Sequence, residues 1–177
     1  MKAFHPGRRL HRLSRTPLLL VAALLFAPLA LASGYTTKGL LFLSAGGLVS
    51  GTMRPEGFVP AYGVEASLHG YPREDVGIGL FGQWQEVQGE SPHSRFAVGP
   101  QLSYRMVGME LGATYEGGDA QYARTVGLHL APFVSIGVLT ASLRLDVPLW
   151  HESRDVPHRG YDVGGVLAIK IPLPLKR

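Results

Sequence analysis

Apolar and polar residues alternate one by one along most of the chain from residue 58 onward. In the clearest run, 95–106, the even positions from Phe96 to Met106 are apolar and the odd positions are polar or small. Similar runs cover 58–69, 76–85, 109–116, 125–136, 139–149 and 161–173. A period of two places the two sets on opposite faces of a β-strand. With 39–49, which is apolar on both parities and has no assignable faces, these runs predict eight strands.

The connections between the runs alternate in length. Four of them are longer and polar, namely 50–57, 86–94, 117–123 and 151–159. The other three are short and fall at Gly70–Glu74, at Val107-Gly108 and around Val138. Short turns at one end and longer loops at the other are typical of an up-and-down membrane barrel. With both ends of the chain in the periplasm, the long loops would face the exterior of the cell.

The runs on either side of Val107-Gly108 predict a hairpin with these two residues as its turn. In that register Arg105 faces Glu110 on one side of the sheet, and two methionines face each other on the other side. Both pairs match in character, and a register one residue away would lose this agreement. The prediction implies that Arg105→Ala leaves Glu110 unpaired and destabilises the barrel.

The first 32 residues read as a signal peptide. A basic start precedes an apolar stretch from Leu18 to Leu31, and Ala30-Leu31-Ala32 gives a small-x-small cleavage pattern. The apolar stretch has about 14 residues, fewer than the roughly 20 that a spanning helix needs. An uncleaved anchor is the alternative. We therefore expect 1–32 to be removed and 33–177 to form the barrel.

Removal of this segment changes the charge of the chain. The basic start is Lys2, Arg8, Arg9, Arg12 and Arg15. Since these are five of the 17 Lys and Arg residues, 12 remain against all 13 Asp and Glu residues. A nearly neutral protein gives no indication of nucleic-acid binding. The chain has no cysteine, which excludes a lipidated N-terminal cysteine, disulfides and thiolate metal sites.

The non-apolar face decides between a membrane barrel and a soluble one. A soluble, lipocalin-like barrel also has eight strands but turns its apolar face inward. Here the non-apolar face is rich in glycine, which weakens strands and gives a solvent-facing surface no benefit. Small residues suit the narrow interior of an eight-stranded barrel. We expect an interior ion-pair network on this face, made of Glu65, Arg95, Arg105, Glu110, Glu116, His129, Arg144, Asp146, Asp162 and Lys170.

Aromatic residues of the apolar face lie near the ends of the runs. Phe58, Trp84, Phe96, Tyr115 and Tyr161 are close to the long connections, and Tyr104 is close to a short one. Aromatic girdles at both membrane interfaces are typical of transmembrane barrels. Aromatic residues also favour strands in general, which is the alternative interpretation.

In this pattern the chain resembles the small eight-stranded outer-membrane proteins, the group that includes the transmembrane domain of outer-membrane protein A. The resemblance covers 39–175 and rests on the alternation, without a sequence signature. It implies an all-β, antiparallel up-and-down transmembrane barrel, surrounded by outer-membrane lipid and inserted by the barrel assembly machinery. Such proteins usually end in an aromatic residue, whereas this chain ends Pro172-Leu173-Pro174-Leu175-Lys176-Arg177.

Some barrels of this size are enzymes that act on lipid acyl chains with a serine, a histidine and a carboxylate. His93 and Ser94 are neighbours and point in opposite directions in an extended chain. His129 and Ser135 share a face but lie roughly 20 Å apart along the strand. Neither pair is a catalytic dyad, so we expect no enzymatic activity.

The outer connections contain side chains that could ligate Zn²⁺ or Cu²⁺. They are His93, His151, Glu152, Asp155 and His158. Because they belong to two loops that need not touch, solvated loop residues are the simpler interpretation, and we expect no metal and no cofactor.

The sequence therefore predicts a non-enzymatic outer-membrane barrel with a packed polar interior and a structural or surface-interaction role. Eight strands leave no continuous aqueous channel. A binding partner, which the sequence does not identify, would contact chiefly 86–94 and 150–159. The alternatives are an outer-membrane lipid-modifying enzyme and a soluble periplasmic barrel that carries an apolar ligand.

Overall fold

The computed structural model describes residues 38–54, 57–90, 92–119, 121–152, 156–157 and 159–176. The expected signal peptide lies outside these residues. In the described part of the chain, no helix is long and apolar enough to cross a membrane. The regular structure of the described residues consists of eight strands: β1 (Leu41–Arg54), β2 (Gly57–Arg73), β3 (Val76–Val87), β4 (His93–Tyr104), β5 (Val107–Glu116), β6 (Thr125–Ile136), β7 (Leu139–His151) and β8 (Asp162–Lys176).

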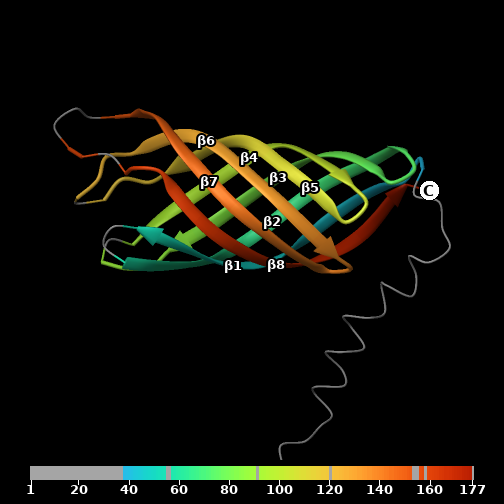
Figure 1. Ribbon diagram of the computed structural model, residues 1–177, viewed down its shortest axis with the longest axis horizontal. Helices are drawn as coiled ribbons and strands as arrows, with labels where there is room; N and C mark the ends of the chain where they lie inside the picture. Colours follow the sequence, from blue (N-terminus) through green and yellow to red (C-terminus); the bar gives the residue numbers. More distant parts are fainter. Residues whose placement is uncertain are drawn as a thin grey trace, which may run out of the picture.

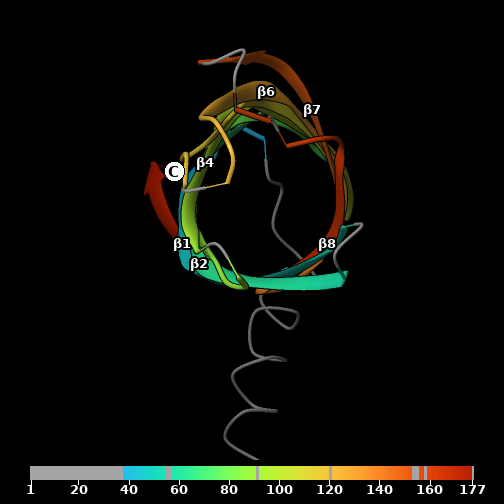
Figure 2. The ribbon, with the colours of Figure 1, turned by 90° about the vertical axis from the view of Figure 1, so that its left-hand side faces the viewer.

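The strands form one closed antiparallel barrel in sequence order, as predicted (Figure 1). Each strand pairs with the next, and β8 closes the barrel by pairing with β1. Viewed along its long axis, the wall surrounds a single interior (Figure 2). Three short turns, at 74–75, 105–106 and 137–138, define what we call the turn end. The connections 88–92, 117–124 and 152–161 define the loop end.

Strand β1 is longer than expected and its faces are now defined. It continues to Arg54 while β2 begins at Gly57, so most of the expected loop 50–57 belongs to the wall. Leu48, Ser50 and Thr52 are buried in the interior, and Val49 and Met53 point outward. The alternation persists through this segment. Its inward residues, Ser50 and Thr52, are small and polar, which is also typical of a loop.

The hairpin between β4 and β5 corrects the predicted turn. Its turn is Arg105-Met106, and Tyr104 pairs with Val107. Glu110 therefore faces Gln101, and the predicted pairing of Glu110 with Arg105 is wrong. The shift is an even number of residues, so every side chain stays on its predicted face and only the partners change. A backbone with φ of 54° at Arg105 gives the tight turn.

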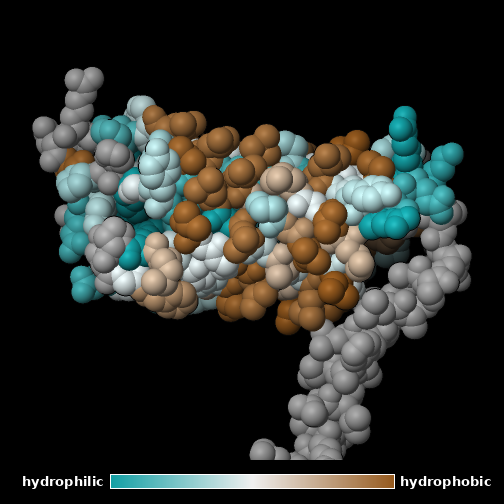
Figure 3. All heavy atoms as spheres, in the orientation of Figure 1, coloured by the Kyte–Doolittle hydropathy of each residue, from teal (hydrophilic) through white to brown (hydrophobic). Residues whose placement is uncertain are grey.

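The apolar face of the wall points outward all round. Leu143 and Leu167 in neighbouring strands are 68% and 62% exposed, whereas Arg144, Asp146 and Asp162 of the same two strands are buried. Figure 3 shows a broad hydrophobic belt between two hydrophilic ends. The exposed side chains include the six predicted girdle residues Phe58, Trp84, Phe96, Tyr104, Tyr115 and Tyr161. A register shift between Val126 and Gly127 also turns Trp150 outward, which the alternation alone did not predict.

Glycines of the inward face allow neighbouring strands to approach each other. A Cβ atom on Gly63 would lie 1.9 Å from the carbonyl oxygen of Trp84, and one on Gly99 would lie 2.1 Å from that of Leu111. The atoms met are backbone atoms of the adjacent strand, which cannot move aside. These glycines therefore allow the wall to curve tightly, because they let adjacent strands approach closely, and they also leave room in the interior.

Candidate functional site

Charged and polar side chains fill the interior of the barrel. Nine of the ten predicted network residues are there and buried: Glu65, Arg95, Glu110, Glu116, His129, Arg144, Asp146, Asp162 and Lys170. They come from β2 and from β4 to β8, because each stands at an inward parity position of its strand. Gln83 and Gln85 of β3 are also buried and join the network.

Arg105 is the exception, and its predicted place in the interior is corrected. Its side chain is 66% exposed at the turn end and pairs with Asp75, with 3.1 Å between Nε and Oδ2. Asp75 occupies the neighbouring turn and also accepts a backbone hydrogen bond from Arg105. This hydrogen-bonded pair raises the pKa of the Arg105 guanidinium above its ordinary value. The turn lies two residues earlier than predicted, so Arg105 belongs to the turn and not to the wall.

Asp146 is the centre of the network at the loop end. Its Oδ1 accepts a hydrogen bond of 2.7 Å from Nδ1 of His129. Its Oδ2 lies 2.8 Å from Nη2 of Arg95 and 3.2 Å from Nε of Arg144. Arg95 is 1% exposed, so this carboxylate neutralises guanidinium charge that has no access to water.

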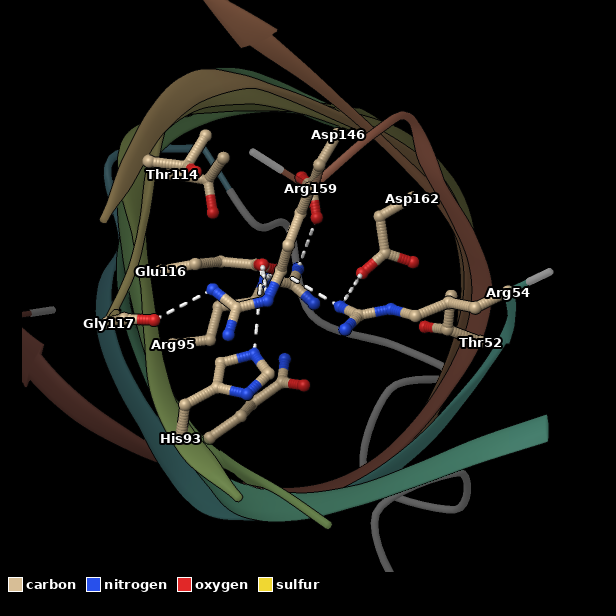
Figure 4. A network of polar contacts seen from close by, with 12 residues as sticks. Thr52, Arg54, His93, Arg95, Thr114, Glu116, Gly117, Asp146, Arg159 and Asp162 are labelled. Carbon is tan, nitrogen blue, oxygen red and sulfur yellow. Dashed lines mark hydrogen bonds and ion pairs between the residues drawn. The ribbon is translucent and has the colours of Figure 1, made fainter. Parts of the chain in front are cut away.

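Arg54 adds a cation that the sequence pattern did not reveal. Its Nη2 lies 3.1 Å from Oδ2 of Asp162 and 3.5 Å from Oε1 of Glu116 (Figure 4). Nη2 of Arg144 also approaches Asp162, at 3.3 Å, and donates to the hydroxyl of Thr52 at 2.6 Å. Arg54 was missed because it fell in the expected first loop. Its even parity, continued from Ser50 and Thr52, was the signal that could have found it.

Arg159 enters the loop end from the last connection, between β7 and β8. It pairs with Asp119, lies 3.6 Å from Oε2 of Glu116 through Nε, and donates to the carbonyl oxygen of Gly117 at 2.7 Å. Its guanidinium also stacks on the ring of Tyr122. Figure 4 shows this side chain crossing the centre of the interior. Nothing in the strand periodicity could place it, since it belongs to no strand.

Asp119 fixes the other side of this contact. Its Oδ1 accepts backbone hydrogen bonds from Gln121 at 2.7 Å and Tyr122 at 2.8 Å. Burial opposes its ionisation, but these two N–H groups and the Arg159 charge outweigh burial and lower the pKa of Asp119. Arg159 and Asp119 therefore hold the connection 117–124 to the connection 152–161.

A second group of charges lies toward the turn end. Lys170 pairs with Glu65, and the amide nitrogen of Gln83 donates to Glu65 at 3.1 Å and to Glu110 at 3.2 Å. His129 lies between the two groups, with Nε2 3.6 Å from Oε2 of Glu110. Its ring also packs against that of Phe81 at an angle of 41°. Polar contacts therefore continue from Lys170 near the turn end to Arg159 at the loop end.

The arrangement does not favour a bound metal ion. Oxygen atoms of Glu116, Asp146 and Asp162 lie within 4.8 Å of one another. The guanidinium groups of Arg54 and Arg95 contact the same carboxylates, as do those of Arg144 and Arg159, so the positive charge is already supplied.

The candidate metal ligands of the outer connections do not form one cluster among the described residues. His93 begins β4 and is buried in the interior, with Nε2 3.7 Å from Oε2 of Glu116, so its predicted place in an outer loop is corrected. His151 ends β7, and Glu152 follows it and pairs with Arg124. Asp155 and His158 lie outside the described residues.

Among the described residues, no hydroxyl group is hydrogen-bonded to a histidine to form a nucleophile and base. Ser94 faces outward and donates to Glu86 at 2.6 Å, while His93 faces inward. His129 is bonded to a carboxylate but has Phe81 and Glu110 as its other neighbours. These contacts support structural roles for the histidines.

Little free volume remains beside the carboxylates of the network. A void of about 20 Å³ lies beside Glu116, Asp146 and Asp162, which is room for about one water molecule. A larger hollow of about 720 Å³ lies on the wall, where the outward side chains of Val64, Trp84 and Phe96 border it. The interior is thus filled by its own side chains at the level of the network.

Fold and interior together define a closed eight-stranded antiparallel barrel with a polar core and an apolar exterior. No protein-family model matches the chain, and a search of curated proteins finds no similar sequence.

Proposed function

We propose that this chain is a non-enzymatic integral protein of the outer membrane, whose barrel spans the bilayer and whose loops provide a surface for interaction. In this proposal, 1–32 is the signal peptide that directs export. Outer-membrane lipid surrounds the wall, and the barrel assembly machinery inserts it. The loop end faces the exterior of the cell.

The observation that carries the proposal is the reversed polarity of the barrel. Arg95, Arg144 and Asp146 are buried, while leucines such as Leu143 and Leu167 are more than half exposed. A soluble protein rarely exposes a continuous apolar belt of this extent. In a bilayer the same belt contacts hydrocarbon, and closure of the sheet gives each strand a neighbour on both sides along the belt.

The packed interior favours a structural role over transport. The network fills the cross-section with neutralised charges, and Arg159 occupies the loop end. An ion that entered would have to separate buried ion pairs, which costs several kcal/mol each. We expect purified barrels in planar bilayers to show no steady conductance above that of protein-free bilayers.

Cell fractionation is the direct test of the proposal. A full-length chain expressed in a Gram-negative host should sediment with the outer membrane, require detergent for extraction, and lose its signal peptide. Its gel mobility should change on heating, because folded barrels resist dodecyl sulfate until they unfold. Release of the protein with the periplasm, without detergent, would contradict the proposal and favour the soluble barrel that carries an apolar ligand.

A second assay addresses the lipid-modifying enzyme as the alternative. Purified barrel is incubated with outer-leaflet lipid, and released acyl chains are measured. Because His93 and Ser94 face opposite sides of the wall, we expect no release above that from a His93→Gln variant. Release that depends on His93 or His129 would overturn the assignment of a non-enzymatic role.

A further inference from the structure

The last residues of β8 extend past the strand that neighbours them. The ladder between β7 and β8 ends at Leu139 and Ile169, and Lys170 adds one bond to the carbonyl oxygen of Val138 in the turn. Pairing of β8 with β1 continues to Lys176. Among the described residues, β8 therefore has a neighbour on one side only beyond Lys170. That stretch is a free sheet edge at the turn end.

The sequence of this edge is unusual for a strand, because Pro172 and Pro174 lie in it. Hydrogen-bonding groups of successive residues point to opposite sides of a strand. The N–H of Lys170 points away from β1, toward Val138. Positions 172 and 174 share its parity, so their nitrogen atoms point to the free edge as well. Proline has no N–H, and the edge lacks these two donors.

The side of β8 that faces β1 keeps all its donors. Residues of odd number, such as Ile171 and Leu173, point their N–H groups to β1 and are not proline. Phe42 and Ser44 of β1 stand opposite the two prolines. Closure of the barrel therefore needs none of the N–H groups that the prolines remove.

Prolines elsewhere in the wall, apart from Pro72 at the irregular end of β2, obey the same geometry. Each pairs in register with one neighbouring strand, while the ladder on its other side is interrupted or has ended. They are Pro60, Pro100, Pro132 and Pro148. Pairing resumes beyond Pro100 and Pro132, whereas no strand resumes on the open side of Pro60, Pro148, Pro172 and Pro174 among the described residues.

We propose that Pro172 and Pro174 close the free edge of β8 to strand addition, so that a second copy of the barrel does not pair with it. An unpaired edge is a template for another strand, and proline on the edge is one way to prevent pairing. The exposed Ile171 and Leu173 would otherwise make this edge an apolar, strand-forming surface. The proposal rests on the register of the sheet and holds in a membrane or in detergent.

The test restores the missing donors. A Pro172→Ala/Pro174→Ala variant is folded in detergent, and its oligomeric state is measured by analytical ultracentrifugation over a range of concentrations. The matched control is Pro100→Ala/Pro132→Ala. It also replaces two prolines, but these lie in β4 and β6, which have a neighbouring strand on both sides. Two restored donors on each chain should raise the dimerisation constant by about tenfold or more.

A cysteine reporter locates the contact. The chain has no cysteine, so Leu173→Cys places a single thiol on the exposed edge. With this cysteine in each protein, we expect disulfide-linked dimers in the Pro172→Ala/Pro174→Ala variant, which we call the edge variant. We expect few in the Pro100→Ala/Pro132→Ala control or in the protein that keeps both edge prolines. An edge variant as monomeric as the control, or a dimer that does not cross-link through position 173, would overturn the proposal. The single Pro172→Ala variant provides the same readout if the double variant does not fold.

Discussion

The arginines of this barrel differ in how far their side chains are exposed to solvent, and this difference determines what each ion pair contributes. Arg95 lies between Asp146 and Glu116 with almost no contact with water, whereas Arg105 pairs with Asp75 in a solvated turn. Loss of a buried partner removes part of the neutralisation from charges that water does not reach. Loss of an exposed one leaves groups that water solvates. The two arginines stand near opposite ends of the same run of alternation, on the same parity, and residue type alone does not distinguish them.

Arg95→Ala should destabilise the barrel by about 3–5 kcal/mol, because Asp146 and Glu116 lose a buried cation. Arg105→Ala should leave stability unchanged within error, contrary to the sequence-based expectation. Both variants are measured by urea unfolding in detergent, with folded and unfolded forms separated by gel mobility. Equal midpoints for the two variants would contradict the described interior.

The carboxyl of Asp119 should titrate below the ordinary Asp value of about 3.9. Backbone N–H groups and Arg159 stabilise its charged form more than burial opposes it. A lowered pKa in the folded state means that this contact is at full strength above the ordinary value. Its contribution is lost as pH falls through the lowered value.

The midpoint is measured from the Asp119 carboxyl carbon by NMR. Arg159→Met should raise it toward the ordinary value, while Arg124→Met, which removes an exposed pair with Glu152, should not. A midpoint in the protein that Arg159→Met does not change would show that the guanidinium has no influence on Asp119.

At the level of the strands, glycine determines how closely the wall can pack. Gly99 and Gly112 face each other across β4 and β5, and a Cβ on either would meet the backbone of the partner strand within 2.2 Å. Gly82 of β3 faces outward and has open space where a Cβ would lie. The same residue type is therefore indispensable in one strand and replaceable in the next.

Gly99→Ala should lower the free energy of unfolding by roughly 1–3 kcal/mol, since the strands must separate to accept a methyl group. Gly82→Ala should leave stability unchanged or raise it by about 0.4–1 kcal/mol, because alanine reduces the freedom of the unfolded chain. Urea unfolding of both variants in the same detergent provides the comparison. A more stable Gly99→Ala variant would show that the close approach is not required.

At the scale of the whole molecule, the proposed function depends on whether hydrocarbon or water surrounds the wall of the barrel. Leu167 points outward between β1 and β7, where it is 62% exposed, and Met53 points outward near the loop end. Arginine at the first position would lie in hydrocarbon if the barrel spans a bilayer, and in water if the barrel is soluble. The two environments predict different energies for the same substitution.

Leu167→Arg should destabilise the barrel in lipid vesicles by about 2–4 kcal/mol, and Met53→Arg by about 0–1 kcal/mol. Denaturant unfolding in vesicles measures both. If Leu167→Arg is as stable as Met53→Arg, the belt does not lie in hydrocarbon, and the membrane assignment is wrong.

The sequence by itself determined the strands and their faces, because a period of two is local and survives an even shift of register. Seven of the eight strands follow runs of alternation, and nine of the ten proposed network residues lie inside. The even shift at the hairpin kept Glu110 inward even though its predicted partner was wrong.

Only the tertiary structure decided which charges meet. Arg144 contacts Asp162 of the adjacent strand but also Thr52 of β1, and Arg95 of β4 reaches Asp146 of β7 across the interior. Such contacts depend on the diameter of the barrel and on the stagger of its strands, which no local pattern contains. Arg54 belongs to the network because β1 extends further than the alternation predicted, and Arg159 belongs to it because the connection between β7 and β8 enters the interior. Arg105 lies outside the network because β4 ends before it.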